Sequence, residues 1–361
     1  MSTITRRYDI DWIRVIAIGL LLIYHIAIGF QPWGMMIAFI TNKESWGSLW
    51  IPMMALNVWR IPLLFFVSGM GVYFAMQNRN WKELIKERTF RIWLPFVFGM
   101  FCIVPIHLYL WQSYYGMSTG YTFDAGHLWF LANIFSYVVI WSPLFFYLKK
   151  NENGVIVKWI QNIFGTPLVW FITVAAFTAE AMIIKPFPYE LYAMTGHGFF
   201  LGLLAFFFGF CFVLAGDGFL KMIVKWRWVF VVIAFGLFIL RWQYFPMNTP
   251  AYRLVMESQS WIFSVLAFGH RYLNRPGKTL SYLSQAAYPV YILHMIFLYL
   301  SSALVFPLSF DVRIKFIAVV LLTVAGCFLT YEFIVRRISF VSMLFGLKRK
   351  DSNKAMQRVG V

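Results

Sequence analysis

Long apolar runs alternate with short polar connections along the whole chain. A run of about 20 apolar residues is long enough to cross the hydrocarbon core of a bilayer as a helix. Ten such runs lie near residues 10–30, 52–76, 91–112, 127–148, 167–184, 197–215, 226–242, 254–270, 282–306 and 315–336. The pattern predicts an all-α, polytopic membrane protein, a bundle of about ten transmembrane helices in a single domain over residues 1–340. A basic tail is expected at 341–361.

Composition supports this interpretation, because 61% of the residues are hydrophobic and only 12% are charged, against about 25% charged in soluble domains. Asp9, Asp11 and Arg14 break the pattern of a secretory signal peptide, so we expect the first run to stay as a helix. The three cysteines are isolated within apolar runs, which favours small core residues over disulfides or metal ligands.

A net charge of +17 is compatible with nucleic-acid binding, so the positions of the positive residues decide its meaning. Of 31 Lys and Arg residues, 23 lie in the two terminal segments and in every second connection, whereas the alternate connections hold 5. This asymmetry predicts cytoplasmic termini and an even number of helices. Anionic lipid, rather than nucleic acid, is the expected partner of the basic face.

Two ionisable residues, Arg14 and His25, lie within the first predicted helix, eleven positions apart. That spacing is about three helical turns, which places both side chains on one face about 16 Å apart along the axis. Because ionisable groups in hydrocarbon are costly, we interpret them as functional-site candidates. In the alternative interpretation, Arg14 snorkels to the inner surface and His25 is a packing histidine.

The predicted topology assigns a depth to the other intramembrane polar residues. His25, Arg60 and His127 fall in the outer half, and His294 falls near the middle of its helix, which predicts an outer-half cavity. Arg14 lies nearer the cytoplasmic face, together with Ser68, Tyr288 and Glu332. An anionic cofactor tail entering from the cytoplasm would meet Arg14, and a hydroxyl acceptor outside would meet His25. Histidine suits removal of a hydroxyl proton, since its unperturbed pKa is about 6.5.

Other polar residues receive a structural interpretation. We expect His107 and His197 to be structural or solvated, and His270 to be solvated at the inner surface. Arg241 and Glu180 are expected to snorkel near helix ends. For Arg60 a functional role is favoured, because its neighbours Trp59 and Pro62 indicate a kinked stretch. No metal-binding, Gly-x-Ser-x-Gly or phosphate-loop motif occurs in the sequence.

Four segments together resemble the signature of the membrane-bound acyltransferase-3 family: DWIRVIAIGLLLIYH at the start, PLLFFVSGM at 62–70, HLWFL at 127–131 and YPVYILH at 288–294. They occur in the family's order and span nearly the whole chain. HLWFL and YPVYILH in a bare ten-helix chain look most like the branch that includes periplasmic glucan succinyltransferases. The extracellular hydrolase-like domain of some relatives is absent from this sequence.

The resemblance implies an O-acyltransferase that moves an acetyl, succinyl or other acyl group from cytoplasmic acyl-coenzyme A to a carbohydrate or glycan outside a bacterial inner membrane. By the same resemblance Arg14 and His25 are the catalytic pair, with His25 as general base and Arg14 orienting the donor. Direct transfer and an acyl-enzyme on His25 or Ser68 both stay open. No metal is expected. The candidate substrate-binding residues are Arg60, Ser68, His127, Trp129, Tyr288, His294 and Glu332.

Two other classes of function are compatible with the same residues. In a transporter or flippase for an envelope polysaccharide or lipid-linked sugar, Arg14 and His25 would line a path. In a noncatalytic membrane partner, the charged face would be a helix-packing device. For a dicarboxylic donor such as a succinyl thioester, Arg60 is the expected partner of the free carboxylate. The acyl group, the acceptor and the oligomeric state are not determined by the sequence.

Overall fold

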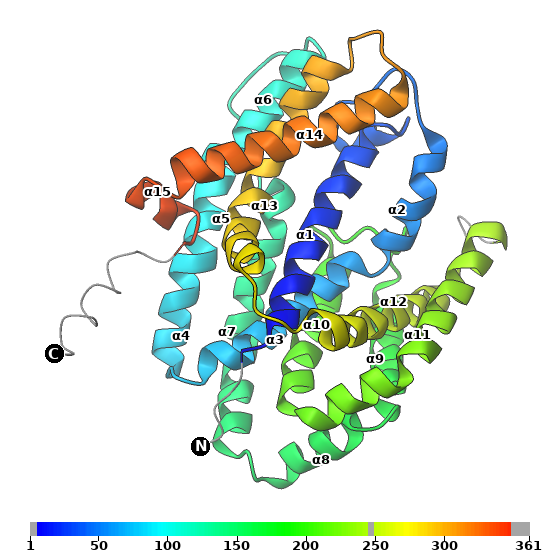
Figure 1. Ribbon diagram of the computed structural model, residues 1–361, viewed down its shortest axis with the longest axis vertical. Coiled ribbons are helices and arrows are strands. Elements are labelled where there is room, and N and C mark those ends of the chain that lie inside the picture. The colour runs from blue at the N-terminus through cyan, green and yellow to red at the C-terminus, as the bar shows by residue number, and fades with distance from the viewer. Residues whose placement is uncertain (1–5, 245–248, 348–361) are drawn as a thin grey trace. The chain divides into compact units, whose positions relative to one another are not determined.

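The computed structural model describes residues 6–244 and 249–347, which form helices joined by short connections (Figure 1). The helices are α1 (Tyr8–Ile28), α2 (Trp50–Asn57), α3 (Arg60–Met76), α4 (Trp81–Arg88), α5 (Leu94–Phe98), α6 (Val104–Tyr114), α7 (Trp129–Lys150), α8 (Val155–Phe164), α9 (Leu168–Ile184), α10 (Gly196–Leu214), α11 (Asp217–Tyr244), α12 (Ala251–Phe268), α13 (Lys278–Val305), α14 (Val312–Thr330) and α15 (Ser339–Leu344). The described residues contain no β-strand, and the all-α prediction is confirmed. Of the predicted basic tail at 341–361, residues 348–361 lie outside the described residues.

Within residues 6–244 and 249–347, eight helical stretches are long and apolar enough to cross a membrane; α8 and α9 meet the same test only when taken together, and they are bent by 101° at their junction. A polytopic membrane protein is therefore confirmed. The run predicted at 254–270 does form a helix, α12. Its interior carries the buried polar residues Glu257, Ser258, Gln259 and Ser260, so composition alone does not mark it as a membrane span. The orientation of the termini stays a prediction.

The predicted span at 52–76 is interrupted between α2 and α3, at Val58 and Trp59. Pro62 lacks the N–H that would bond to the carbonyl of Val58 in a continuous helix. The hydroxyl of Tyr192 donates to that carbonyl instead, at 3.1 Å. The irregularity expected near Trp59 and Pro62 is found, and a side chain from a distant connection completes its backbone hydrogen bonding.

The same arrangement recurs in the helical stretch from α4 to α6, which contains π-helical turns at Thr89–Trp93 and Gly99–Ile103. Pro105 cannot donate to the carbonyl of Phe101. The hydroxyl of Tyr121 donates to this carbonyl at 2.9 Å. In both places a tyrosine from a connecting segment satisfies an acceptor that a proline leaves without its helical donor.

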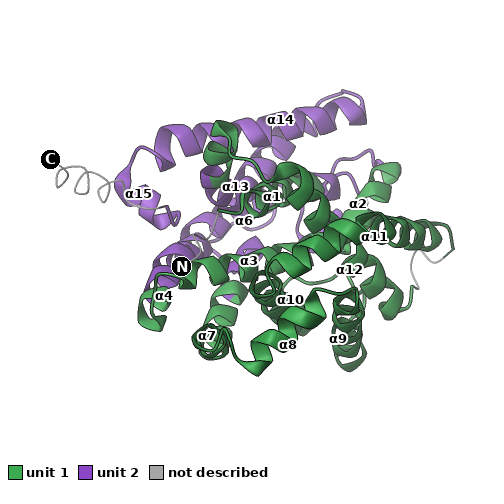
Figure 2. Cartoon of the chain, turned by 60° about the horizontal axis from the view of Figure 1, so that its bottom comes forward, with its two compact units in different colours: residues 1–24, 47–85, 133–284 green, residues 25–46, 86–132, 285–361 purple. Residues whose placement is uncertain are grey.

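The chain divides into two compact units, each assembled from three separate segments (Figure 2). Unit 1 consists of Met1–Tyr24, Gly47–Ile85 and Asn133–Ser284. Unit 2 consists of His25–Trp46, Lys86–Ala132 and Gln285–Val361. Helix α1 belongs to unit 1 up to Tyr24 and to unit 2 from His25 onward. The prediction of one domain over 1–340 stays a prediction.

In unit 1, α3 and α10 pack with their backbones in contact. A Cβ added to Gly69 would collide with the carbonyl of Phe206, and one added to Gly209 would collide with the carbonyl of Phe66. Glycine at both positions permits this approach, as small residues do at many membrane helix interfaces. The contact fixes α3, which carries Arg60 and Ser68. The three cysteines of the chain are free thiols, and two of them are buried.

Candidate functional site

Unit 2 contains four histidines whose rings contact one another, His25, His107, His127 and His294, here named the histidine cluster. His25 lies in the last turn of α1 and His294 in the middle of α13. His294 is 0% exposed and His107 is 3% exposed, whereas His25 and His127 are half-buried. The cluster therefore has an enclosed side and an accessible side.

His25 and His294 are joined by a hydrogen bond. Nδ1 of His25 lies 2.8 Å from Nε2 of His294, and the two rings are nearly parallel, with an angle of 6° between their planes. Both residues were predicted to share one cavity from their separate positions in the sequence. The structure places them in direct contact, although their chemical roles stay predictions.

Backbone contacts determine the tautomers of this pair. Nδ1 of His294 lies against the carbonyl oxygen of Tyr291, which can only accept, so Nδ1 carries the proton and Nε2 holds the lone pair. His25 must then donate from Nδ1 to that Nε2. In neutral His25 the lone pair is consequently on Nε2, and this is the atom through which His25 can accept a proton.

His127 lies in the turn Gly126–Leu128 and is held against α13 by two hydrogen bonds of opposite direction. Its Nε2 donates to the carbonyl of Ile292 at 3.1 Å, and the hydroxyl of Tyr291 donates to the His127 carbonyl. Its ring stands edge-on to the ring of His294, with centroids 4.9 Å apart. Nδ1 of His127 is buried and has no hydrogen-bond partner among the described residues.

His107 is the fourth member of the cluster, and its placement refines the sequence interpretation. It is buried rather than solvated, and its ring lies 5.6 Å from that of His127 and 5.1 Å from that of Tyr299. Tyr299 in turn donates to the carbonyl of Ala38. His107 therefore lies on the buried side of the cluster, between the rings of His127 and Tyr299, and its structural role stays a prediction.

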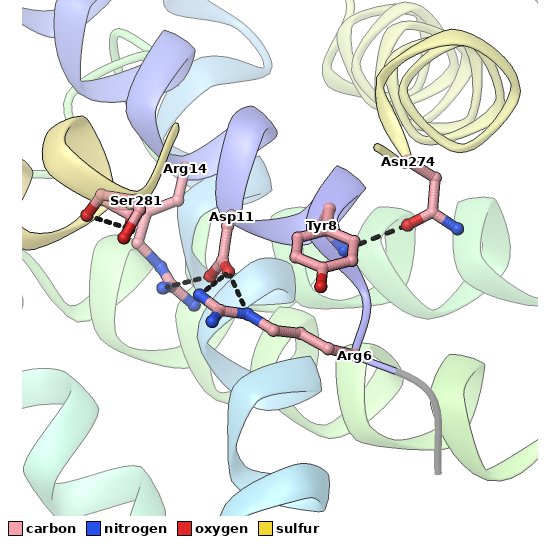
Figure 3. A network of polar contacts seen from close by, with 7 residues as sticks. Arg6, Tyr8, Asp11, Arg14, Asn274 and Ser281 are labelled. Carbon is pink, nitrogen blue, oxygen red and sulfur yellow. Dashed lines mark hydrogen bonds and ion pairs between the residues drawn. The ribbon is translucent and has the colours of Figure 1, made fainter. Parts of the chain in front are cut away.

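Arg14 belongs to unit 1 and lies in a charged network at the start of α1 (Figure 3). Asp11 lies between two guanidinium groups, 2.9 Å from Nη2 of Arg6 and 3.4 Å from Nη1 of Arg14. The Arg14 guanidinium also faces α3 at Gly71, where an added Cβ would be 3.5 Å from Nη2. The network carries one more positive than negative charge, so it attracts anions.

Arg60, the first residue of α3, is 2% exposed. Its Cζ atom lies 3.7 Å from the centroid of the Tyr24 ring. Ser68, one residue before Gly69 on the same helix, donates its hydroxyl to the Leu64 carbonyl at 2.7 Å. This bond directs the hydroxyl toward the backbone of its own helix.

The remaining predicted site residues lie in unit 2. Trp129 is 8% exposed and begins α7, two residues after His127. The hydroxyl of Tyr288 is buried without a hydrogen-bond partner among the described residues. Glu332 pairs with Arg336 at 3.0 Å in a partly exposed ion pair. Trp129 is thus adjacent in sequence to the cluster, whereas Glu332 is engaged in an ion pair of its own segment.

The expectation that Arg241 and Glu180 snorkel is wrong. Arg241 is 3% exposed and binds both carboxylate oxygens of Glu257 at 2.8 Å, together with the carbonyl of Met54. Glu180 is 7% exposed and lies 2.9 Å from Nδ1 of His197. Each charge lies near a helix end but finds a buried partner on another element, which removes the need to reach solvent.

Two residues of the site region were missed at the sequence level. Tyr291 contacts His127 and its carbonyl sets the tautomer of His294; its position inside YPVYILH was the available signal. Asp11, which pairs with Arg14, was interpreted only as evidence against a signal peptide. Within residues 6–244 and 249–347, no group of three or more His, Cys, Asp or Glu side chains is arranged to hold a metal ion.

Among known protein families, the family model described as an acyltransferase domain, of the acyltransferase-3 type, matches residues 7–332. The match covers all four segments on which the resemblance was based, and it includes every residue of the histidine cluster and the Arg14 network from Arg7 onward. Comparison with curated proteins and with solved structures gives no match.

Proposed function

The chain belongs to the acyltransferase-3 family, and we propose that it transfers an acyl group from cytoplasmic acyl-coenzyme A to a hydroxyl of a carbohydrate or glycan outside the membrane. Family membership makes it a membrane acyltransferase of a non-aminoacyl group. The donor, the acceptor and a place in a bacterial inner membrane are our proposals. The observation that carries the proposed role of His25 as general base is its hydrogen bond to His294.

In the proposed reaction, Nε2 of His25 removes the proton of the acceptor hydroxyl as its oxygen attacks the carbonyl carbon of the thioester. The carbon–sulfur bond then breaks. The coenzyme A thiolate that leaves accepts the proton from His25, which regenerates the neutral imidazole. General base catalysis of this kind contributes about 10² to 10⁴ in rate. His294 orients the ring and accepts a hydrogen bond from Nδ1–H, which strengthens when His25 becomes positively charged.

Other residues receive binding roles in this proposal. Arg14, in a network with a net positive charge, binds an anionic part of coenzyme A. His127 and Trp129 contact the acceptor, because Nδ1 of His127 is an acceptor atom beside His294. Tyr288, with a buried hydroxyl, contacts the donor arm. Ser68 and Glu332 are assigned to donor binding on the weaker basis of their sequence positions.

The test is transfer of a labelled acyl group by the purified full-length protein. Wild-type protein is expected to label a glycan acceptor, and both His25→Ala and Arg14→Ala are expected to lose this activity. Arg275→Gln, which changes an exposed cation of unit 1, is the control for general effects of charge removal. Full activity of His25→Ala contradicts the proposal.

Thermal stability with free coenzyme A separates the enzyme from a transporter. A ligand that binds the folded protein raises its stability by mass action, so coenzyme A is expected to raise the melting temperature. A shift with an acceptor sugar, but none with millimolar coenzyme A, would instead favour a transporter or flippase.

A further inference from the structure

Among its described residues, unit 1 contains two buried arginines, and carboxylates neutralise only Arg241. Arg241 has both carboxylate oxygens of Glu257 at 2.8 Å and Glu190 at 3.6 Å. Arg60 is equally buried, at 2% exposure, yet no carboxylate among the described residues lies within ion-pair distance of it. Two of its three nitrogens, Nε and Nη1, are buried and have no hydrogen-bond partner among those residues.

The surroundings of Arg60 are aromatic rather than acidic. Tyr24 presents its ring face to the guanidinium at 3.7 Å, and Trp50 packs on Tyr24 with ring centroids 5.3 Å apart. Tyr192 also interacts with Arg60 electrostatically, but its hydroxyl donates to the backbone of Val58. A cation–π contact offsets only part of the cost of burying a charge.

Glu190, two residues before Tyr192 in the sequence, does not form an ion pair with Arg60. Its carboxylate lies 3.6 Å from Nη1 of Arg241 and is 22% exposed. Its electrostatic effect falls on Tyr24 and Tyr192, the two tyrosines that face Arg60. The guanidinium therefore lies against aromatic rings and interacts with Tyr24, while its Nε and Nη1 have no hydrogen-bond partner among the described residues.

We propose that Arg60 is the centre of a buried binding site for a single carboxylate group. A carboxylate would neutralise the guanidinium and accept charge-assisted hydrogen bonds from its N–H groups, which are short and strong. A carboxylate carries one charge, and so matches the single charge of Arg60. A phosphate dianion would leave excess negative charge in the apolar surroundings, which is costly.

Two kinds of ligand could supply this carboxylate to an acyltransferase, and the selection of these two rests on the proposed function. One is the free end of a dicarboxylic acyl group, and the other is an acidic sugar of the acceptor. The binding site itself does not depend on catalysis, because its occupancy is measured without turnover. Methyl succinate, which carries one carboxylate as a succinyl thioester does, represents the first source, and glucuronate represents the second.

The experiment is thermal unfolding of the full-length protein in detergent, with sodium methyl succinate, glucuronate, phosphate or chloride at matched ionic strength. Methyl succinate or glucuronate is expected to raise the melting temperature of wild type by about 2 °C at several times its Kd. Arg60→Gln should lose this shift, Arg60→Lys should retain part of it, and Arg275→Gln should keep all of it. The carboxylate that acts identifies the source.

Calorimetric titration of wild-type protein with methyl succinate and with the neutral diamide of succinic acid provides a measurement that needs no variant. Binding of methyl succinate and not of the diamide supports the site. Three results would overturn it: no response to either carboxylate, an equal response in Arg60→Gln, or a response to phosphate alone. Equal binding of the diamide would likewise overturn it, because recognition would then not depend on charge.

Discussion

His25 donates a hydrogen bond from Nδ1 to Nε2 of His294 over 2.8 Å, and His294 is itself fixed by the carbonyl of Tyr291. This chain of contacts makes His294 a positioning residue for the proposed base. A hydrogen bond to a charged group contributes about 1.5–3 kcal/mol, which corresponds to roughly 10 to 150-fold in rate.

We therefore expect His294→Ala to lower kcat by about that factor with little change in the KM for acyl-coenzyme A. His294→Gln should recover part of the rate, because its Oε1 can accept from Nδ1 of His25. Kinetics of the two variants check this, with His270→Gln as a control histidine change. A purely structural role for His294 would lower the amount of folded protein and leave kcat of the remainder unchanged.

Arg14 and Asp11 should have opposite effects on donor binding. Arg14→Gln removes a cation and is expected to raise the KM for acyl-coenzyme A. Asp11→Asn removes the carboxylate between Arg6 and Arg14, so it makes the network more positive and should lower that KM. Both effects should shrink at high ionic strength, since salt screens partly exposed charges. A rise in KM for both variants would show that Asp11 acts by orienting Arg14.

The ion pair between Arg241 and Glu257 is a matter of stability rather than catalysis. Glu257→Gln leaves a buried guanidinium without its main partner and should destabilise the protein by about 3–5 kcal/mol. Replacing both residues by methionine should recover much of this loss, because an apolar pair of similar volume has no charge to desolvate. Thermal unfolding in detergent measures both changes. A mild effect of Glu257→Gln would mean that Glu190 neutralises Arg241 unaided.

Gly209 is expected to be required for packing of α10 on α3. Gly209→Ala places a methyl group against the carbonyl of Phe66, where neither backbone can move freely, so the melting temperature should fall. The matched control is Gly236→Ala in α11, where an added Cβ meets no atom within 4 Å. That change should be neutral or stabilise the helix by up to about 1 kcal/mol. Equal effects at the two glycines would contradict the backbone contact.

The sequence predicted the helices well because hydrophobicity over 20 residues is a local property. The kink near Arg60 could also be predicted from the sequence, since Pro62 removes a specific helical hydrogen bond. Length and hydropathy do not identify α12 as a membrane span, because Glu257 and its polar neighbours lower the mean hydropathy of this helix. These side chains are buried within the protein. Hydropathy measures composition and does not register what a helix packs against.

Pairing between distant residues could not be predicted in the same way. The partners of Arg241 lie in the connection before α10 and in α12, so its position near a helix end suggested snorkelling instead. His25 and His294 are separated by 269 positions. The depths predicted from the topology indicated that the two residues lie near each other, but they could not predict the hydrogen bond or which ring nitrogen carries the proton. The proposed roles of His25 and His294 rest on the contacts of their ring nitrogens, which form only in the folded chain.

We propose that His25 acts as the base in acyl transfer to a glycan. Its most direct test is mass spectrometry of envelope glycans from a strain lacking this protein, complemented with wild type, His25→Gln or His270→Gln. Wild type and His270→Gln are expected to restore a mass increment, which identifies the acyl group, while His25→Gln at equal abundance in the membrane should not. Full restoration by His25→Gln, or no change of glycan mass with wild type, would contradict the account.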